Sequence, residues 1–320
     1  MKDTLKEKLV VLIGPTAVGK TQLSIELAKK LDAEIISGDS MQIYRGMDIG
    51  TAKITKDEME GIPHHLIDIK EPHESFSVAE FQTVVRELIK DIHNRGRIPM
   101  IVGGTGLYIQ SVIYDYQFTD DGSDPEYRQR LEQEISTNGV DCLFEKLKEI
   151  DPASAERIHP NNVRRLIRAL EIYHSTGKTM SEYLDEQQQE LIYDVALIGL
   201  TMDRDKLYER INKRVDIMMD SGLLEEVSRF YQSGLRDCQS IQAIGYKELY
   251  GYLDGELSLD AAVDQLKQNT RRYAKRQLTW FRNKMDVKWF DMTETGQFYE
   301  KFNEIYKYIA GKLRITENRY

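Results

Sequence analysis

A glycine-rich loop near the N-terminus constrains the fold of this chain more than any other feature. Residues 14–21, GPTAVGKT, match the pattern G-x-x-x-x-G-K-[ST], and the apolar run LVVLIG precedes the loop while the helix-like TQLSIELAKKL follows it. In such loops backbone N–H groups surround a phosphate chain, the lysine adds positive charge and the threonine hydroxyl ligates magnesium. Most of them bind ATP or GTP, but the loop alone does not identify the molecule that carries the phosphates. We expect a diphosphate or nucleotide site at Gly14, Pro15, Thr16, Ala17, Val18, Gly19, Lys20 and Thr21, with Thr21 as a Mg²⁺ ligand.

Short apolar runs alternate with helical patterns along much of the chain. Helical spacing of apolar residues marks 78–93 and 207–219, and the further runs that read as buried strands are 34–37, 98–102, 195–200 and 287–290. Alternation of this kind is typical of an α/β fold with a doubly wound parallel sheet, which binds ligands at the carboxyl ends of its strands.

One segment interrupts the alternation. Residues 119–194 are polar and helix-like, opened by TDDGSDP and closed near the acidic stretch DEQQQE. A chain of 320 residues exceeds the usual size of one domain. We therefore expect a P-loop α/β core at 1–118 and 195–320, and a helical insertion domain at 119–194.

Composition and charge limit the classes of function. Hydrophobic residues are 41% and charged residues 30% of the chain, and no apolar run approaches the roughly 20 residues that span a bilayer, so a cytoplasmic protein is expected. Its two cysteines are far apart, which favours neither a disulfide framework nor a zinc module. The net charge is −9, yet Lys and Arg are concentrated in 157–178 and 264–284, as expected for one face that contacts an anionic polymer.

The stretch SGDSMQIYRGMDIGTAK, residues 37–53, follows the second predicted strand and carries Asp39 just beyond the strand end. A carboxylate there can act as a general base or contact the magnesium shell, but Asp39 or Ser40 can equally cap a helix. The residues alone leave this open.

The strand at 98–102 runs into Gly103, Gly104, Thr105 and Gly106 instead of an acid. In many nucleotide-hydrolysing proteins an acid at this place organises magnesium and water, so its absence weakens an ATPase interpretation. The adjacent His64 and His65 have no third ligand at helical spacing, which favours structural or positioning roles over metal binding.

Seven motifs in order resemble the tRNA dimethylallyltransferase family, the isopentenyl-tRNA transferases, over nearly the full length. They are GPTAVGKT, SGDSMQIYRGMDIGTAK, HHLID, GGTGLY, RALE, AIGYKE and RRYAKRQLTWFR. The resemblance implies transfer of a dimethylallyl group from dimethylallyl diphosphate to N6 of the adenine 3′-adjacent to the anticodon, in tRNAs that read codons starting with U. It also implies Mg²⁺ as cofactor and tRNA, through its anticodon stem-loop, as partner.

The resemblance assigns roles by position. Asp39 would be the general base, Thr105 would lie at the reacting centre, and the loop at 14–21 would hold the isoprenoid diphosphate, with Thr21 touching magnesium. Two departures from the family pattern are Ile54, where proline is frequent, and Arg164, where many members have glutamine. The implied tRNA-contacting positions are Asp39, Ser40, Met41, Gln42, Thr105, Arg128, Arg164, Arg165, Leu166, Ile167 and Arg168.

Other functions compete with this interpretation. A small-molecule kinase of the P-loop type would transfer phosphate from ATP, an RNA-binding switch would bind tRNA without modifying it, and a cytokinin-forming relative would prenylate free adenylates. The basic segments argue against the last of these. We expect a monomer, while the RNA contacts of Arg271, Arg272 and Arg276, and any binding of ATP, are left open by the sequence.

Overall fold

The computed structural model describes residues 6–118, 124–187 and 190–315. Its contacts divide the chain into two compact units. The core unit comprises Met1–Ile113 with Leu191–Tyr320, and the helical unit comprises Tyr114–Glu190. Two parts of the predicted insertion lie outside the described residues, its opening at 119–123 and residues 188–189 near its end.

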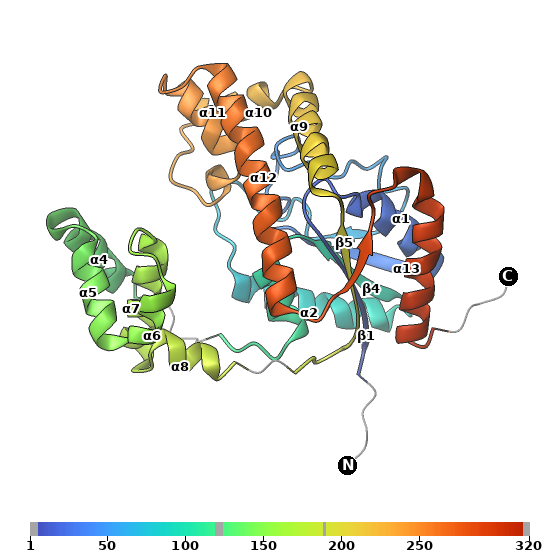
Figure 1. Cartoon of the computed structure of the whole chain (residues 1–320), viewed down its shortest axis with the longest axis horizontal. Coiled ribbons are helices and arrows are strands. Elements are labelled where there is room, and N and C mark those ends of the chain that lie inside the picture. The colour runs from blue at the N-terminus through green and yellow to red at the C-terminus, as the bar shows by residue number, and fades with distance from the viewer. Residues whose placement is uncertain (1–5, 119–123, 188–189, 316–320) are drawn as a thin grey trace, which may run out of the picture. The chain divides into compact units, whose positions relative to one another are not determined.

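The core unit contains the predicted parallel sheet, and the α/β fold class is confirmed (Figure 1). The six strands lie in the order β3-β2-β4-β1-β5-β6, and every neighbouring pair is parallel. The strands are β1 Lys8–Ile13, β2 Ala33–Gly38, β3 His64–His65, β4 Ile98–Gly103, β5 Asp194–Thr201 and β6 Lys288–Asp291.

Register places three strand ends at one level of the sheet. Gly103 at the end of β4 lies opposite both Ile13 of β1 and Gly38 of β2. The segments that follow these three strands therefore emerge side by side at the carboxyl edge, where doubly wound sheets bind their ligands.

The helices of the core unit follow from periodic apolar residues and local caps. For example, Ser77 and Glu80 form a reciprocal capping box at the start of the second helix. The helices are α1 Lys20–Leu31, α2 Val78–Asn94, α3 Gly106–Ile113, α9 Arg204–Asp220, α10 Leu223–Gln232, α11 Tyr246–Leu253, α12 Leu259–Lys284 and α13 Phe298–Lys312, with short 3₁₀ turns at Ser240–Gln242 and Thr295–Gln297.

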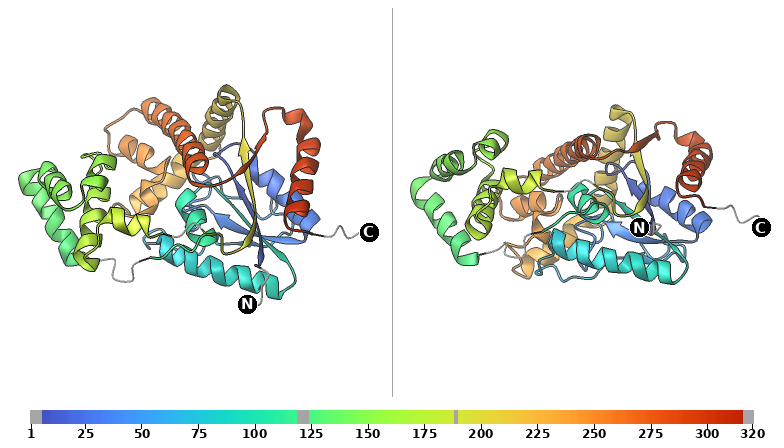
Figure 2. Two further views of the ribbon diagram at one scale, coloured as in Figure 1. Left: turned by 60° about the horizontal axis from the view of Figure 1, so that its bottom comes forward. Right: turned by 90° about the horizontal axis from the view of Figure 1, so that it is seen from below.

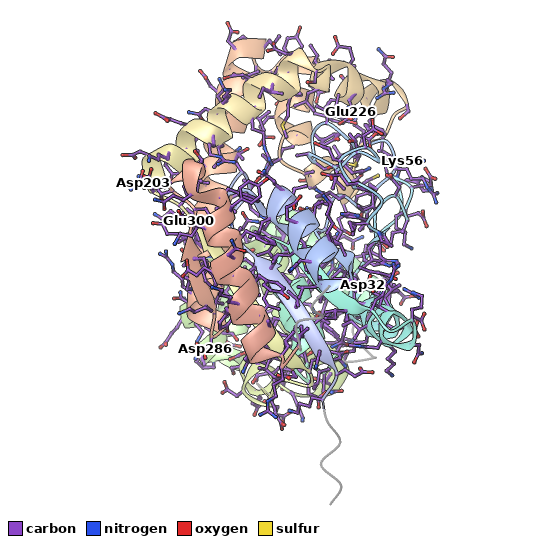
Figure 3. All side chains as sticks on the ribbon, turned by 90° about the vertical axis from the view of Figure 1, so that its right-hand side faces the viewer. Asp32, Lys56, Asp203, Glu226, Asp286 and Glu300 are labelled. Atoms are coloured by element: carbon purple, nitrogen blue, oxygen red, sulfur yellow. The ribbon has the colours of Figure 1, made fainter. Side chains whose placement is uncertain are left out.

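An apolar core lies on one face of the sheet, where α1 and α13 contribute most of its helical residues. Alternate strand residues such as Val10 and Leu12 pack with Leu23 and Leu27 of α1 and Ile305 of α13. Figures 1, 2 and 3 show α1 and α13 side by side, although they stand at opposite ends of the sequence. The C-terminal helix thus completes the core that carries the phosphate-binding loop.

The helical unit has an apolar core of its own. Leu131, Leu143, Leu147, Leu166 and Leu170 are buried together at its centre. Its helices are α4 Pro125–Asn138, α5 Asp141–Ile150, α6 Pro152–Arg157, α7 Val163–Thr176 and α8 Met180–Asp185. An independent core of this kind is what allows a segment to interrupt a sheet without disturbing it.

Two findings complement the sequence predictions. The edge strand β3 was not predicted, because its two histidines carry no apolar pattern. His65 Nε2 lies 2.7 Å from a carboxylate oxygen of Glu34. Over the residues that the structure describes, no helix combines the length and the apolar character needed to cross a membrane.

Candidate active site

The phosphate-binding loop lies between β1 and α1, as predicted. A Cβ atom on Gly14 would lie 2.9 Å from the backbone oxygen of Leu200, so only glycine allows β5 this close. Gly19, with φ of 107°, lies at the start of α1, whose first backbone N–H groups have no intrahelical partner. Lys20 Nζ donates to the backbone oxygens of Gly14 at 2.9 Å and Pro15 at 2.8 Å. The loop is therefore closed on itself with its lysine held in place.

Positive charge gathers at this loop, and among the described residues no carboxylate lies within ion-pair distance of Lys20 or Arg214, although Glu58 lines the same cavity. Burial and the charge of Arg214 lower the pKa of the Lys20 ammonium to about 7, and the carboxylate of Asp39 opposes this shift. Arg214 lies near the loop, since its Nη1 is 3.5 Å from Thr16 Oγ1, and burial and Arg210 lower its pKa. A group of cations that destabilise one another is suited to bind a polyanion, which would relieve the repulsion.

Asp39 directly follows β2 and faces the same region. Its Oδ1 accepts hydrogen bonds from the backbone N–H of Met41 at 2.8 Å and of Gln42 at 3.3 Å. Burial raises the pKa of the Asp39 carboxyl, while these two N–H donors and the charge of Lys20 act in the opposite direction. No helix begins at Asp39, so it caps a turn and not the helix that the sequence allowed, and it is also a desolvated carboxylate in a cavity.

The loop after β4 is attached to both neighbouring loops. Thr105 Oγ1 accepts from the backbone N–H of Ser40 at 3.2 Å. Gln277 of α12 accepts from the backbone N–H of Thr16 at 3.0 Å and donates to the backbone oxygen of Gly104 at 3.1 Å. A buried glutamine therefore joins the phosphate-binding loop to the glycine loop, and the predicted site residues of the core unit come together.

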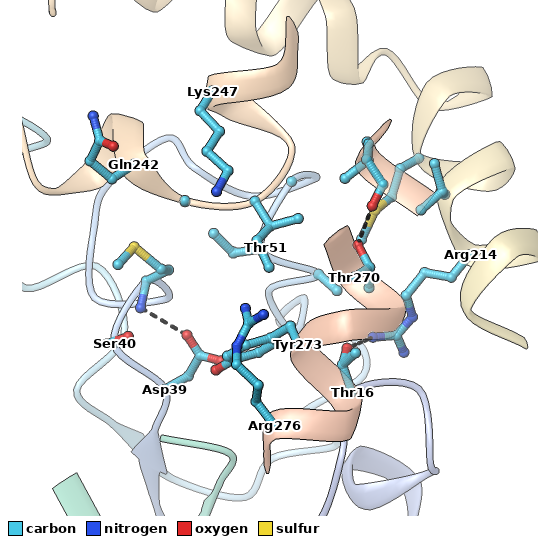
Figure 4. A pocket seen from close by; sticks show the side chains of 18 residues that line it. Thr16, Asp39, Ser40, Thr51, Arg214, Gln242, Lys247, Thr270, Tyr273 and Arg276 are labelled. Carbon is cyan, nitrogen blue, oxygen red and sulfur yellow. Dashed lines mark hydrogen bonds between the residues drawn. The ribbon is translucent and has the colours of Figure 1, made fainter. Parts of the chain in front are cut away.

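Two cavities meet at Asp39. The P-loop cavity, of about 490 Å³, includes Lys20, Thr21 and Arg210 in its lining. The α12 cavity, of about 310 Å³, includes Lys247, Arg276 and the apolar Met218 (Figure 4). Six residues line both cavities: Thr16, Asp39, Thr51, Ala52, Arg214 and Tyr273. Asp39 thus stands where a ligand in one cavity would meet a ligand in the other.

Some predicted positions have other surroundings. Val18 is buried in the core below the loop, and the side-chain amide of Gln42 donates to the backbone oxygens of Thr51 and Ala52. Gln42 therefore also holds part of the cavity wall. Ser40 and Met41 line the α12 cavity.

Six of the predicted tRNA-contacting positions, Arg128 and residues 164–168, lie in the helical unit. Leu166 and Ile167 are buried in its core, whereas Arg164 and Arg165 are exposed on α7. Arg168 Nη1 lies 3.8 Å from Glu171. Arg128 donates to the two carboxylate oxygens of Glu171 at 2.7 and 2.9 Å, so part of its function is to neutralise a buried acid.

Several lining residues were not assigned a role from the sequence. Tyr273, Arg276 and Gln277 fall within the basic segment at 264–284, for which the sequence predicted anionic contacts without assigning them to single residues, and Lys247 falls within AIGYKE, a motif that entered through the resemblance. No motif around Arg214 predicts a role in the site, because its helix has the ordinary pattern of an exposed basic face. Only the packing of α9 and α12 over the strand ends shows which of these cations face the site.

The donor set near the loop fits magnesium held through a ligand. Mg²⁺ in phosphate sites keeps several waters and takes few protein ligands. Thr21 lies in the first turn of α1 and lines the P-loop cavity. No group of three His, Cys, Asp or Glu side chains suited to a metal occurs among the described residues. The Thr21 hydroxyl and an incoming diphosphate would therefore supply the ligands other than water.

Comparisons with known proteins identify the family of the chain. The family model described as IPP transferase matches residues 42–284. The tRNA dimethylallyltransferase of Anoxybacillus flavithermus is 69% identical over 98% of this chain and 99% of its own. The crystal structure of the full-length tRNA isopentenylpyrophosphate transferase from Bacillus halodurans has 58% identity and a TM-score of 0.74, with 97% of each chain covered. A eukaryotic dimethylallyltransferase acting on tRNA is 34% identical with a TM-score of 0.80, over 93% of this chain and 77% of that one. The resemblance indicated by the motifs is confirmed, and the chain belongs to the IPP transferase family.

Proposed function

We propose that this protein transfers the dimethylallyl group of dimethylallyl diphosphate to N6 of the adenine 3′-adjacent to the anticodon, in tRNAs that read codons starting with U. The products are N6-dimethylallyladenosine in tRNA and diphosphate. One observation carries the proposal: a desolvated carboxylate, Asp39, lies where the P-loop cavity, which contains Lys20 and Arg214, meets a second cavity. Family membership supports the same reaction class.

The P-loop cavity would hold the diphosphate. Lys20, Arg214 and the N–H groups at the start of α1 surround a space suited to its oxygens. Charge on the leaving oxygen grows as its bond to carbon breaks, and preorganised donors of this kind are each worth about 3 to 4 kcal/mol in a transition state. Mg²⁺, held by Thr21 and the diphosphate, would neutralise part of the same charge. A P-loop kinase would use the same groups for phosphate transfer, so membership of the IPP transferase family is what favours departure of the diphosphate.

The amine would be activated at Asp39. The N6 nitrogen forms a bond to C1 of the dimethylallyl group with its lone pair, the C1–O bond breaks, and the diphosphate leaves with that electron pair. The proton released from N6 goes to the Asp39 carboxylate. Because burial raises the pKa of Asp39, its ionised form is a stronger base than an exposed aspartate.

The wall of the α12 cavity suits the remaining groups. Val215, Met218 and Leu266 give it an apolar side that would contact the isoprenoid and exclude water from the allylic carbon. Lys247 and Arg276 give it a basic side that would contact RNA phosphates around an extracted adenine. Within the helical unit, Arg164 and Arg165 are the exposed cations of the predicted RNA-contacting segment.

The test is incubation of the purified protein with labelled dimethylallyl diphosphate and unmodified tRNA, followed by nucleoside analysis. We expect label in N6-dimethylallyladenosine at the position 3′ of the anticodon. Parallel reactions with ATP in place of the isoprenoid diphosphate, and with AMP in place of tRNA, test the kinase and adenylate alternatives. Phosphate transfer from ATP, or preferred prenylation of AMP, would overturn the proposal.

A further inference from the structure

A buried glutamate outside the cavities holds part of their wall. Glu226 of α10, labelled in Figure 3, is 2% exposed, and its side chain contacts the turn at residues 47–52. Its Oε2 accepts from the backbone N–H of Asp48 at 2.9 Å and of Ile49 at 2.8 Å, and its Oε1 accepts from that of Gly50 at 3.0 Å. One carboxylate therefore satisfies three consecutive N–H groups of a turn that has no strand or helix to pair them.

A tyrosine fixes the same contact from the other side. The Tyr246 hydroxyl at the start of α11 donates to Oε1 of Glu226. Its fully buried ring lies against Gly50, where an added Cβ atom would stand 2.5 Å from Cε2. The turn is thus held to α10 by hydrogen bonds and to α11 by a contact that leaves no room for a side chain.

Hydrogen bonds continue from this turn to the proposed base. The Gln42 side-chain amide donates to the backbone oxygens of Thr51 at 3.2 Å and Ala52 at 3.3 Å, and the Gln42 backbone N–H donates to Asp39 Oδ1. Thr51 and Ala52 also line both cavities. Movement of the turn would consequently change the cavity wall and the segment that orients Asp39.

We propose that Glu226 is a positioning residue for prenyl transfer, which acts by fixing the turn at 47–52 and, through Gln42, the orientation of Asp39. The inference rests on the proposed function, since Asp39 serves as base only in that reaction. Glu226 lines neither cavity, so its effect is exerted through the turn and not by touching a substrate.

The variant Glu226→Gln keeps the shape of the side chain and replaces one acceptor oxygen by a donor. At least one backbone N–H or the Tyr246 hydroxyl then loses its partner in a buried place. We expect kcat at saturating substrates to fall about tenfold to a hundredfold, because small displacements of a reacting group are costly. Loosened N–H contacts to Asp39 would also move the acidic limb of the pH profile of kcat to higher pH.

A matched control separates positioning from loss of stability. Glu34 is also a buried glutamate with several partners, but it lies at the start of β2, whereas Asp39 follows the end of that strand. Glu34→Gln is expected to lower the unfolding temperature while leaving kcat and the acidic limb unchanged in the folded protein. Equal kcat and pH profiles for Glu226→Gln and Glu34→Gln would overturn the inference.

A second variant covers the case in which Glu226→Gln does not fold. Gly50→Ala pushes the turn away from the buried Tyr246 ring and leaves the carboxylate in place, so it should reproduce the lower kcat and the shifted limb. Tyr246→Phe keeps the ring and three of the four hydrogen bonds, and we expect a smaller loss than for Gly50→Ala. Unchanged kcat in Gly50→Ala would contradict the inference, whereas an inactive wild-type protein would instead contradict the proposed function.

Discussion

The two ends of strand β2 carry acidic residues in opposite electrostatic surroundings. At its start, Glu34 receives hydrogen bonds from Arg95 at 2.6 and 3.0 Å and lies 2.7 Å from His65 Nε2. The hydrogen bonds from Arg95 above all, with those from His65, hold the pKa of Glu34 down at about 2. At the other end, the hydrogen bonds that the described residues give to the Asp39 carboxylate come from backbone N–H groups, and burial raises its pKa.

The contrast separates a structural carboxylate from a chemical one. A carboxylate neutralised by a guanidinium is stable and a poor proton acceptor, whereas a desolvated one keeps its affinity for a proton. Lys20 is a second group whose charged form is destabilised, in this case a cation, because burial and Arg214 lower the pKa of its ammonium. Asp39 and Lys20, whose charged forms are destabilised, lie at the carboxyl edge of the sheet. Glu34, whose charged form is stabilised by its partners, lies at the start of β2.

The largest expected effect is that of Asp39→Asn. The amide oxygen can still accept from Met41 and Gln42, so the turn is retained while the base is lost. We expect prenyl transfer to fall about a hundredfold to ten-thousandfold, with tRNA affinity within a few-fold of the wild type. Single-turnover rates and a binding titration with an anticodon stem-loop measure the two quantities. Undiminished turnover would show that Asp39 belongs with Glu34 as a structural residue.

Removal of the loop cation should be the next largest effect. Lys20→Met keeps an apolar side chain of similar length but removes the charge and the donors to the backbone of Gly14 and Pro15. We expect the rate of transfer to fall about a hundredfold, the usual effect of losing one such donor. Steady-state kinetics with dimethylallyl diphosphate test this. A loss of similar size in a matched Lys29→Met variant, on the exposed side of α1, would argue for a general effect of charge.

At the other end of β2 the expected effect is on stability. Glu34→Gln removes the charge that pairs with Arg95 and Arg97, and hydrogen bonds to a charged group contribute about 2 kcal/mol. Because the folded-state pKa of Glu34 is lowered to about 2, its contribution is present above its ordinary value and is lost as the pH falls toward 2. Urea unfolding at neutral and acidic pH should therefore show a difference between wild type and variant that shrinks on acidification. A constant difference would exclude the ion pair as its cause.

The sequence predicted the parts of the site that are continuous along the chain. The loop at 14–21, the Asp39 turn and Thr105 each directly follow a predicted strand, and parallel strands bring their carboxyl ends together. Arg214, Gln277 and Glu226 could not be assigned in this way. Each lies on an amphipathic helix whose pattern does not say which neighbour its polar side chains meet. Their partners are 176 to 261 residues away in sequence: Thr16 for Arg214 and for Gln277, and Gly50 for Glu226.

The smallest expected effect is in the pH dependence of catalysis. The pKa of Lys20 is lowered to about 7 in the free protein, so its ammonium loses its proton as the pH rises through 7. Since the charged form binds diphosphate, kcat/KM for dimethylallyl diphosphate should fall above pH 7 by less than about tenfold per pH unit. Bound diphosphate supplies the missing negative charge and raises the pKa of Lys20 again, so kcat should keep its value to a higher pH than kcat/KM.

The variant Lys20→Arg carries a charge that does not titrate in this range, and its kcat/KM should lack the basic limb. If the wild-type kcat/KM instead stayed constant well above pH 7, Lys20 would already be compensated without a ligand, and the contrast between the two ends of β2 would hold for Asp39 alone.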